Sequence, residues 1–180
     1  KNLITLGGQH QGVFGMPRCP EDSKSKTLDA LCDMMRDMLN IGAYVKFVQD
    51  RLVQAEYWHD PLDEKKYLSD CIFMPDINNE GPNKNQTYKA NMLKLQNFAM
   101  IMFENDTMVT PRFSEWFGWY RPGQDKELIP LQETAIYKED WIGLKELDQT
   151  NRLHFMETPG NHLQFTKEYF IENVINKFLK

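Results

Sequence analysis

The feature that most constrains the fold of this chain is the alternation of short apolar runs with amphipathic, helix-like segments. The first apolar run ends at two glycines, Gly7 and Gly8, and the second passes directly into an acidic loop, ENDTMVTP. Buried strands separated by amphipathic helices are typical of α/β proteins that contain a parallel sheet. The strand-like runs are NLITL (2–6), FAMIMF (98–103) and RLHFME (152–157).

Helix-like segments are recognised by apolar residues at spacings of three and four. One such stripe starts at Thr27, a second pattern covers residues 43–55, and a third segment, TYKANMLKL, spans 87–95. The last segment of the chain has Thr166 as a candidate N-cap. Its predicted apolar face consists of Phe170, Val174, Ile175 and Phe178.

The order of these segments predicts how the chain is organised. At 180 residues it fits one domain, or most of a larger one. Residues from about 10 to 95 are mostly helical or loop-like and lie between the first two strands. This predicts a helical insertion over the sheet, after which strands and helices resume over about 97–180.

Composition argues against several classes of protein. The net charge of −5 disfavours a nucleic-acid partner, because phosphates require a basic face. No run approaches ~18 consecutive apolar residues, so no transmembrane segment is expected. No spacing of His, Cys and Glu suggests zinc, and no phosphate-binding loop or dinucleotide motif is present. We therefore expect neither a metal nor another cofactor.

The start of the chain, KNLITLGG, has no initiator methionine and none of the regions of a signal peptide. Natural chains rarely begin inside a strand. We therefore expect a fragment or a trimmed chain.

Three cysteines and two sequons bear on the compartment. Cys19 and Cys32 bracket a polar stretch that a disulfide could close, but three free thiols, with Cys71 as the third, fit the spacing equally well. The sequons begin at Asn85 and Asn105. They are weak evidence for secretion, because such triplets also occur by chance.

Two loops that follow predicted strands carry residues suited to acid–base chemistry. Asp106 comes after FAMIMF, and His162 comes after RLHFME in the stretch TPGNH. In open α/β sheets functional residues gather after the carboxyl ends of strands. The order Asp then His matches the last two members of an α/β-hydrolase triad, in which a carboxylate orients the histidine that moves the nucleophile's proton. A turn-capping aspartate and a surface histidine are the alternative interpretation.

The nucleophile of such a triad is missing from this sequence. It should lie in G-x-S-x-G between a strand and a helix, and it should precede Asp106. No serine or cysteine has that context, so the motif is expected before the strand that opens the chain. The serines are Ser23, Ser25, Ser69 and Ser114.

The remaining candidates are weaker. Among the other histidines, His10 lies in a glycine-rich loop, His59 follows a tryptophan, and His154 lies inside a strand-like run. Methionines on the first helix-like stripe, with aromatic residues nearby, fit either a groove for a flexible apolar ligand or ordinary core. The methionines and aromatic residues are Met34, Met35, Met38, Phe47, Tyr57 and Trp58.

Longer motifs follow one another along the chain. They are GGQHQGVFGMPRCP (7–20), NIGAYVKFVQDRLVQAEYWHDP (40–61), FENDTMVTP (103–111), SEWFGWYRPGQDKELIPLQET (114–134), GLKELD (143–148) and GNHLQ (160–164). Together they resemble one family, the lysosomal palmitoyl-protein thioesterases. The resemblance covers essentially the whole chain but only the later portion of the family's catalytic domain.

The resemblance implies an α/β-hydrolase fold, present here in part, with a helical insertion that helps to form a fatty-acyl groove. It implies hydrolysis of the thioester between a long-chain acyl group, typically palmitate, and a protein cysteine. Asp106 matches the family's triad aspartate in N-D-[ST], and His162 matches its triad histidine in G-[DN]-H-L-Q. S-palmitoylated proteins or peptides are the implied substrates, and acyl-coenzyme A is left open.

The resemblance also assigns residues outside the triad, and it implies a lysosomal location through the secretory pathway, with secretion also compatible. Cys71 stands where the family has a different segment, so an unpaired thiol is expected there. The loop between Cys19 and Cys32, which match a disulfide pair of the family, is longer here than expected for the family. The remaining assignments are a disulfide between Cys19 and Cys32, glycosylation at Asn85 and Asn105, and acyl-chain contacts at Trp58 and Met108.

The family's serine and its main oxyanion donors match nothing after Lys1 and are expected upstream. The chain alone is therefore expected to have little or no esterase activity, and its first strand to present an unpaired apolar edge. The alternative is a shortened, catalytically dead homologue that binds acyl chains or a protein partner.

Overall fold

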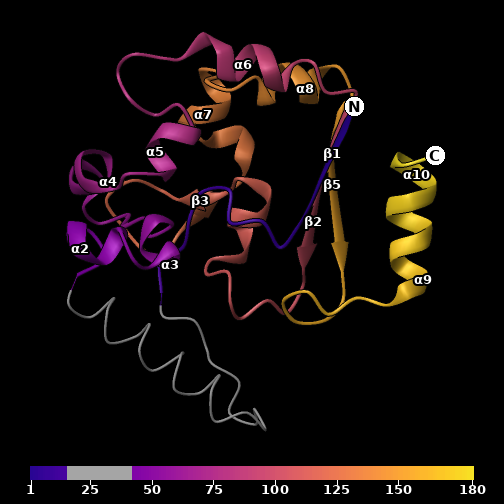
Figure 1. Ribbon diagram of the computed structural model, residues 1–180, viewed down its shortest axis with the longest axis horizontal. Helices are drawn as coiled ribbons and strands as arrows, with labels where there is room; N and C mark the ends of the chain where they lie inside the picture. The colour runs from indigo at the N-terminus through magenta and orange to yellow at the C-terminus, as the bar shows by residue number, and fades with distance from the viewer. Residues whose placement is uncertain (16–41) are drawn as a thin grey trace, which may run out of the picture.

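Three parallel strands form the central sheet of the computed structural model, which describes residues 1–15 and 42–180. They are β1 (Asn2–Leu6), β2 (Asn97–Phe103) and β5 (Leu153–Thr158), in the order β1-β2-β5 (Figure 1). All three predicted strands are confirmed to within one residue at either end. The middle strand, β2, is buried from Phe98 to Phe103, as its continuous apolar run predicts.

The first strand lies at one edge of this sheet and pairs only with β2 among the described elements. Leu3 is opposite Phe98, and Phe98 is in turn opposite Leu153. All five residues of β1 are partly exposed in the described part of the chain. The N-terminal strand is therefore an edge strand within these residues, as expected.

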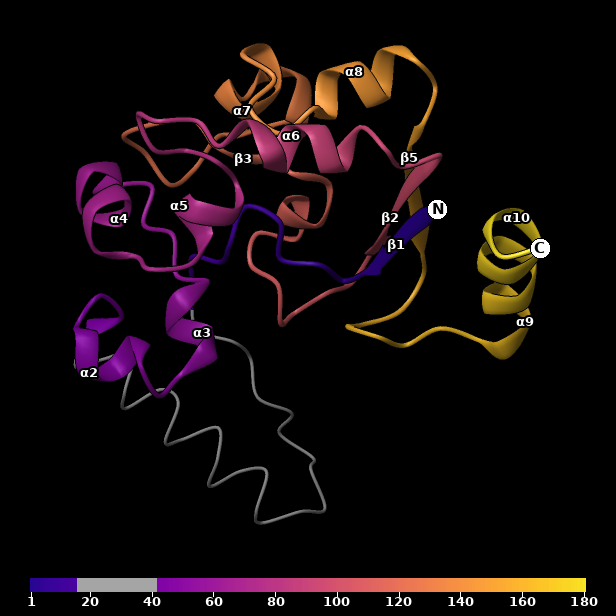
Figure 2. The same ribbon diagram turned by 45° about the horizontal axis from the view of Figure 1, so that its top comes forward.

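Five short helices lie between β1 and β2 in the part of that connection that the structure describes. They are α2 (Lys46–Gln49), α3 (Val53–Glu56), α4 (Glu64–Asp70), α5 (Met74–Ile77) and α6 (Gln86–Met92). Helices α2 to α5 gather at one end of the molecule, away from the sheet (Figures 1 and 2). The helix predicted from TYKANMLKL is confirmed as α6, whereas the stripe that starts at Thr27 lies outside the described residues.

The single helix predicted over residues 43–55 is wrong, because the chain leaves the helical conformation at Leu52, between α2 and α3. The buried amide of Gln49 occupies this break. Its Nε2 donates to the carbonyls of Ala43 (3.0 Å) and Ala55 (3.3 Å), and its Oε1 accepts the N–H of Ile72 (2.9 Å). These long-range contacts stabilise two short helices in place of one.

The segment after β2 covers one face of the sheet, on the side where α2 to α6 also lie (Figures 1 and 2). Its elements are the 3-10 helices η1 (Arg112–Trp116) and η2 (Leu131–Glu133), the hairpin strands β3 (Trp119–Tyr120) and β4 (Leu128–Ile129), and the helices α7 (Ala135–Lys138) and α8 (Leu144–Gln149). The main core forms where these elements meet the sheet. It consists of Phe98, Met100, Phe117, Leu131, Ile136, Ile142, Leu144, Leu147 and Leu153.

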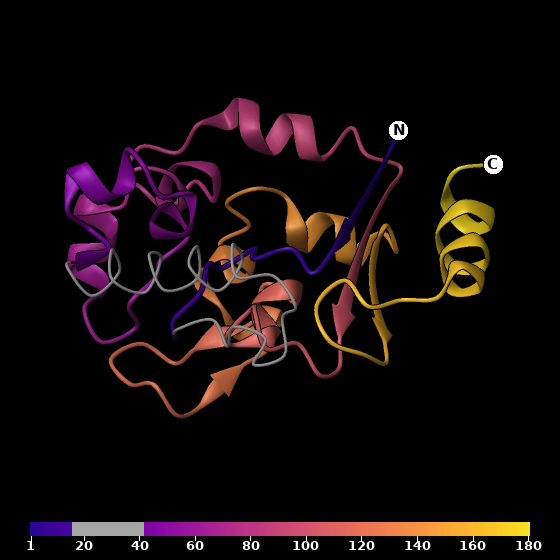
Figure 3. The same cartoon turned by 60° about the horizontal axis from the view of Figure 1, so that its bottom comes forward.

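The C-terminal helical segment lies against the opposite face of the sheet (Figures 1 and 3). It contains α9 (Lys167–Phe170), a π-helical stretch η3 (Ile171–Ile175) and α10 (Asn176–Phe178). Thr166 caps it as predicted, since its Oγ1 accepts the N–H of Tyr169 at 3.1 Å. Val174 and Phe178 are buried, which confirms the predicted face.

Within residues 1–15 and 42–180, no helix is long and apolar enough to cross a membrane. The same residues contain no group of three or more His, Cys, Asp or Glu side chains arranged to hold a metal ion.

Candidate active site

The site lies where β2 and β5 end, because adjacent parallel strands place their following loops at the same edge of the sheet (Figures 1 and 3). Asp106 lies in the turn after β2, and His162 lies four residues beyond the end of β5. His162 Nδ1 and Asp106 Oδ2 are 2.6 Å apart. The structure thus brings together the acid and the histidine that the sequence singled out, although 56 residues separate them.

Asp106 is held as an anion by three polar contacts. Its side chain has no solvent exposure, and its Oδ1 accepts the backbone N–H groups of Met108 (2.7 Å) and Val109 (2.8 Å). Burial alone would raise the pKa of this carboxyl. The hydrogen bonds from His162, Val109 and Met108 outweigh burial, and the pKa of Asp106 is lowered.

Asn161 ties the two loops together. Its Oδ1 accepts the N–H of Thr107 (2.9 Å) and the N–H of His162 (2.7 Å). One amide oxygen therefore fixes the residue after Asp106 and the backbone of the histidine at once. This second link between the loops was not found from the sequence, because an asparagine in a glycine-containing turn is an ordinary turn residue.

The imidazole of His162 lies against Gly7, the residue that ends β1. Gly7 has φ +62°, and a Cβ built on it would be 2.7 Å from His162 Cε1 and 2.9 Å from Nδ1. Only glycine fits here, because the backbone has a positive φ and because a Cβ would clash with the imidazole. The histidine side chain is 26% exposed, and no partner of its Nε2 is found among residues 1–15 and 42–180. Nε2 is thus the nitrogen available to a reacting group.

Glu115 is a functional candidate that sequence reasoning missed. It lies in η1, has no solvent exposure, and accepts the N–H of Phe103 through Oε2 at 3.1 Å. Burial, and next the nearby charge of Asp106, raise the pKa of Glu115 to about 9. The one signal in the sequence was an acid inside an aromatic run, EWFGWY.

The other histidines are packed in the interior or pair within the fold. His10 stacks on Phe117 with ring centroids 4.5 Å apart, and burial lowers the pKa of His10 to about 4. His154 Nε2 lies 2.8 Å from Asn97 Oδ1. None of them contacts Asp106 or His162 in the described structure.

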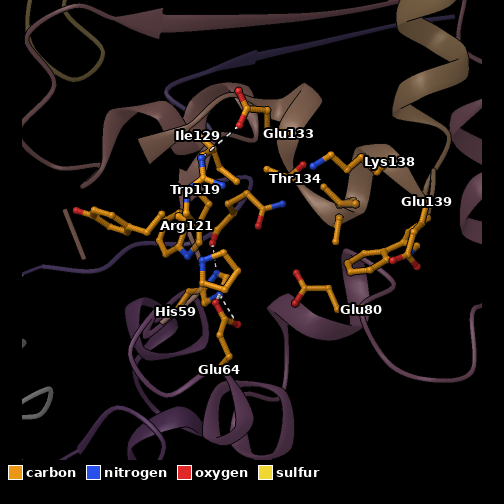
Figure 4. A pocket seen from close by; sticks show the side chains of 16 residues that line it. His59, Glu64, Glu80, Trp119, Arg121, Ile129, Glu133, Thr134, Lys138 and Glu139 are labelled. Carbon is orange, nitrogen blue, oxygen red and sulfur yellow. Dashed lines mark hydrogen bonds and ion pairs between the residues drawn. The ribbon is translucent and has the colours of Figure 1, made fainter. Parts of the chain in front are cut away.

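A cavity of about 500 Å³, with several charged residues in its lining, lies on the side of β3 and α7, apart from the Asp106–His162 pair. His59 lies in its wall, stacked between Tyr67 (3.7 Å) and Trp119 (4.4 Å), with Nε2 3.1 Å from Glu64. Figure 4 shows Glu80 and Lys138 directed toward the enclosed space. The charged lining does not suit an acyl chain.

A smaller cavity, of about 250 Å³, is mostly apolar. Trp116, Leu131 and Phe155 are among the residues that line it.

Trp58 and Met108, the proposed acyl contacts, are linked through the loop that follows β1. Trp58 packs beside Phe14, with ring centroids 5.5 Å apart, and the N–H of Phe14 donates to Thr110 at 2.7 Å. Met108 is exposed two residues before Thr110. The loop after β1 therefore contacts both Trp58 and the segment that follows Met108.

The structure describes both predicted glycosylation sites and Cys71, but not the predicted disulfide. Asn85 and Asn105 are both exposed, and Asn85 also caps α6 by accepting the N–H of Thr87. Cys71 is a buried free thiol within the described chain, and its Sγ contacts the carbonyl of Glu56 at 3.1 Å. The predicted disulfide, Cys19 with Cys32, lies outside the described residues.

Comparison with known proteins gives one consistent family. The family model for palmitoyl protein thioesterases matches residues 1–162. Palmitoyl-protein thioesterase 1 of Caenorhabditis elegans is 46% identical over 178 residues, which are 99% of this chain and 57% of that protein. Palmitoyl-protein thioesterase 3 of Dictyostelium discoideum is 38% identical over 174 residues, which are 94% of this chain and 56% of that protein.

A more distant match is the lysosomal thioesterase PPT2 of Homo sapiens, at 33% identity over 94 residues, or 52% of this chain and 30% of that protein. The chain spans little more than half the length of the two more similar relatives.

Proposed function

The chain belongs to the palmitoyl-protein thioesterase family, and from this premise we propose that it carries the acid–base pair of a serine-type thioester hydrolase. Asp106 is the proposed orienting acid and His162 the proposed general base. The observation that supports these roles is the 2.6 Å contact between Asp106 Oδ2 and His162 Nδ1, which leaves Nε2 for a substrate-side proton.

The nucleophile is proposed to be a serine in a part of the protein outside this sequence. Ser114 is buried and donates to the carbonyl of Gly12 (2.7 Å), and exposed Ser69 donates to Asp70 (2.7 Å). Ser23 and Ser25 lie outside the described residues. None of the four lies in G-x-S-x-G.

In the first proposed step, the serine oxygen attacks the thioester carbonyl while His162 Nε2 takes its proton. The tetrahedral intermediate collapses, the C–S bond breaks, and the histidinium returns the proton to the leaving thiolate. Water, deprotonated by the same nitrogen, then hydrolyses the acyl-serine to a fatty acid and free serine. Asp106 stabilises the imidazolium in both halves of the reaction.

The proposed substrates are proteins or peptides with long-chain acyl groups on cysteine, as the names of the relatives suggest. Acyl-coenzyme A is a further candidate that presents the same thioester. Helices α2 to α6 are proposed to cover an acyl groove, with Trp58 and Met108 at its wall. The α/β-hydrolase architecture is proposed for the whole protein.

We further propose a lysosomal location reached through the secretory pathway, which the relatives named lysosomal thioesterases support. Exposed Asn85 and Asn105 would then carry glycans, and Cys19 and Cys32 would form a disulfide. Digestion with an N-glycosidase should increase the gel mobility of the protein in two steps. An unchanged mobility would contradict both glycan assignments.

The second candidate function is a catalytically dead module that binds acyl chains or a protein partner. The two candidates differ in whether the whole protein supplies the G-x-S-x-G serine that this sequence does not contain. A fluorophosphonate probe on the natural protein separates the two. Labelling of a serine outside this segment supports the enzyme, and absence of labelling supports the dead module.

The acid–base roles are tested by His162→Ala and Asp106→Asn in the complete protein. Each should lower kcat for a palmitoyl thioester by about 10³-fold or more with the fold intact. The controls are His154→Ala and the exposed Asp125→Asn, which should keep nearly full activity. Near-normal turnover by either site variant would overturn the assignment.

A further inference from the structure

Glu115 holds the beginning of the turn that carries Asp106. Its Oε2 accepts the N–H of Phe103, the last residue of β2, at 3.1 Å. The carbonyl of Phe103 in turn accepts the N–H of Asp106 at 3.1 Å. Glu115 thus holds the N–H of the residue whose carbonyl begins the Asp106 turn.

The surroundings of the two acids favour the proton on Glu115: the pKa of Glu115 is raised and the pKa of Asp106 is lowered. Two carboxyl groups close together in a buried site disfavour ionisation of both, and the one that receives more hydrogen bonds keeps the charge. Asp106 receives hydrogen bonds from His162, Met108 and Val109, whereas Glu115 receives one, from Phe103.

The surroundings of Glu115 agree with this assignment. Its burial and then the nearby charge of Asp106 raise the pKa of Glu115, and the hydrogen bond from Phe103 and the charge of Arg112 only partly offset this. The buried Oε1 has no hydrogen-bond donor in the described part of the chain. That is the oxygen expected to carry the proton.

We propose that Glu115 is a positioning residue that acts as a neutral acid, accepting the N–H of Phe103 and donating its own proton in a hydrogen bond to Asp106. The proposal rests on the hydrolase function above. The donated hydrogen bond keeps the Asp106 carboxylate in one orientation, with Oδ2 toward His162. Loss of the proton would place two anions side by side and displace the Asp106 turn.

The test uses two variants of the complete protein. Glu115→Gln keeps an acceptor for Phe103 and a donor for Asp106, and it should stay within about threefold of the natural kcat. Glu115→Leu removes both contacts and leaves a buried N–H unpaired, so kcat should fall about 10- to 100-fold with little change in KM. Exposed Glu127→Gln is the matched control for the substitution itself.

The pH profile distinguishes this role from a merely structural one. The natural protein should lose kcat as the pH rises through about 9, where Glu115 gives up its proton. Glu115→Gln cannot ionise and should lack that loss, while Glu127→Gln should retain it. Turnover is corrected for the spontaneous hydrolysis of thioesters in alkali.

Three results would overturn the proposal. Glu115→Gln could lose as much activity as Glu115→Leu, its alkaline profile could match that of the natural protein, or Glu115→Leu could turn over normally. If Glu115→Leu does not fold, the Gln variant and its profile still decide. His162→Ala, measured in parallel, keeps the inferences separate, because its failure to lower activity would reject the hydrolase function itself.

Discussion

At the scale of single residues, two carboxyl groups near one another have opposite protonation states. Hydrogen bonds lower the pKa of Asp106, so its contribution to stability is present above the ordinary aspartate pKa and is lost as the pH falls through the lowered value. Burial, and then the charge of Asp106, raise the pKa of Glu115, so its contribution has the opposite sign. At neutral pH the contribution of Asp106 to stability is therefore present, whereas that of Glu115 is partly lost.

Glu115→Gln should therefore stabilise the protein in a pH-dependent way. The natural side chain contributes fully below its ordinary pKa of 4.5, and that contribution is lost progressively as the pH rises toward about 9. The variant's gain in Tm should be small near pH 4 and grow steadily toward pH 8. Thermal unfolding across this range measures it, with Glu127→Gln as the control. A difference in Tm that does not change with pH would contradict the assigned protonation state.

Gly7→Ala should disturb His162 directly. The new methyl group would lie 2.7 Å from the imidazole, at a backbone φ that costs about 1–2 kcal/mol for other residues. We expect kcat for a palmitoyl thioester to fall at least about tenfold, since a small displacement of the base is costly. Gly81→Ala is the control, because a Cβ there meets nothing within 4 Å. Equal activity of the two variants would exclude a role for this close contact.

At the scale of elements, short helices in this chain depend on contacts from elsewhere. Helices α2 and α3 have four residues each, which is too few for a stable isolated helix. The side chain of Gln49 satisfies backbone groups at Ala43 before α2, at Ala55 in α3 and at Ile72. One buried amide therefore replaces the continuous helical hydrogen bonding that the periodicity of this segment predicts.

Gln49→Leu should destabilise the protein by about 1–3 kcal/mol, because it leaves two buried carbonyls and the partly buried N–H of Ile72 without their partner. Chemical denaturation measures the loss. Exposed Gln54→Leu, in α3, makes the same change in side chain without that cost and should be within about 0.5 kcal/mol of the natural protein. Similar stabilities for the two variants would show that the break between α2 and α3 does not depend on the amide.

At the scale of the whole molecule, this chain brings the acid and the base to one edge of a three-stranded sheet. The nucleophile and the oxyanion donors are proposed to come from another part of the protein. The site is then assembled across the molecule, with β2 and β5 supplying the Asp106 and His162 loops and the loop after β1 supplying Gly7.

The 180-residue chain expressed by itself should accordingly hydrolyse palmitoyl thioesters no faster than its His162→Ala variant. A longer form that includes the G-x-S-x-G segment should be faster by orders of magnitude. Turnover of one fluorogenic acyl thioester by both forms measures this. Activity of the 180-residue chain that His162→Ala abolishes would mean that the nucleophile lies within it.

The sequence by itself determined the features that depend on near neighbours in the chain. The three strands, the N-cap at Thr166 and the placement of Asp106 and His162 after strands all follow from short-range patterns of side chains. These patterns could be read because strand burial and helix capping act over a few residues.

Only the tertiary structure decided what depends on residues far apart in the chain. The break at Leu52 is accompanied by a contact of Gln49 with Ile72, 23 positions later, and the raised pKa of Glu115 follows from its burial in the folded structure. The need for glycine at position 7 follows from a histidine 155 positions later. Burial, charge and steric contact depend on distance in space, and distance along the chain does not reveal them.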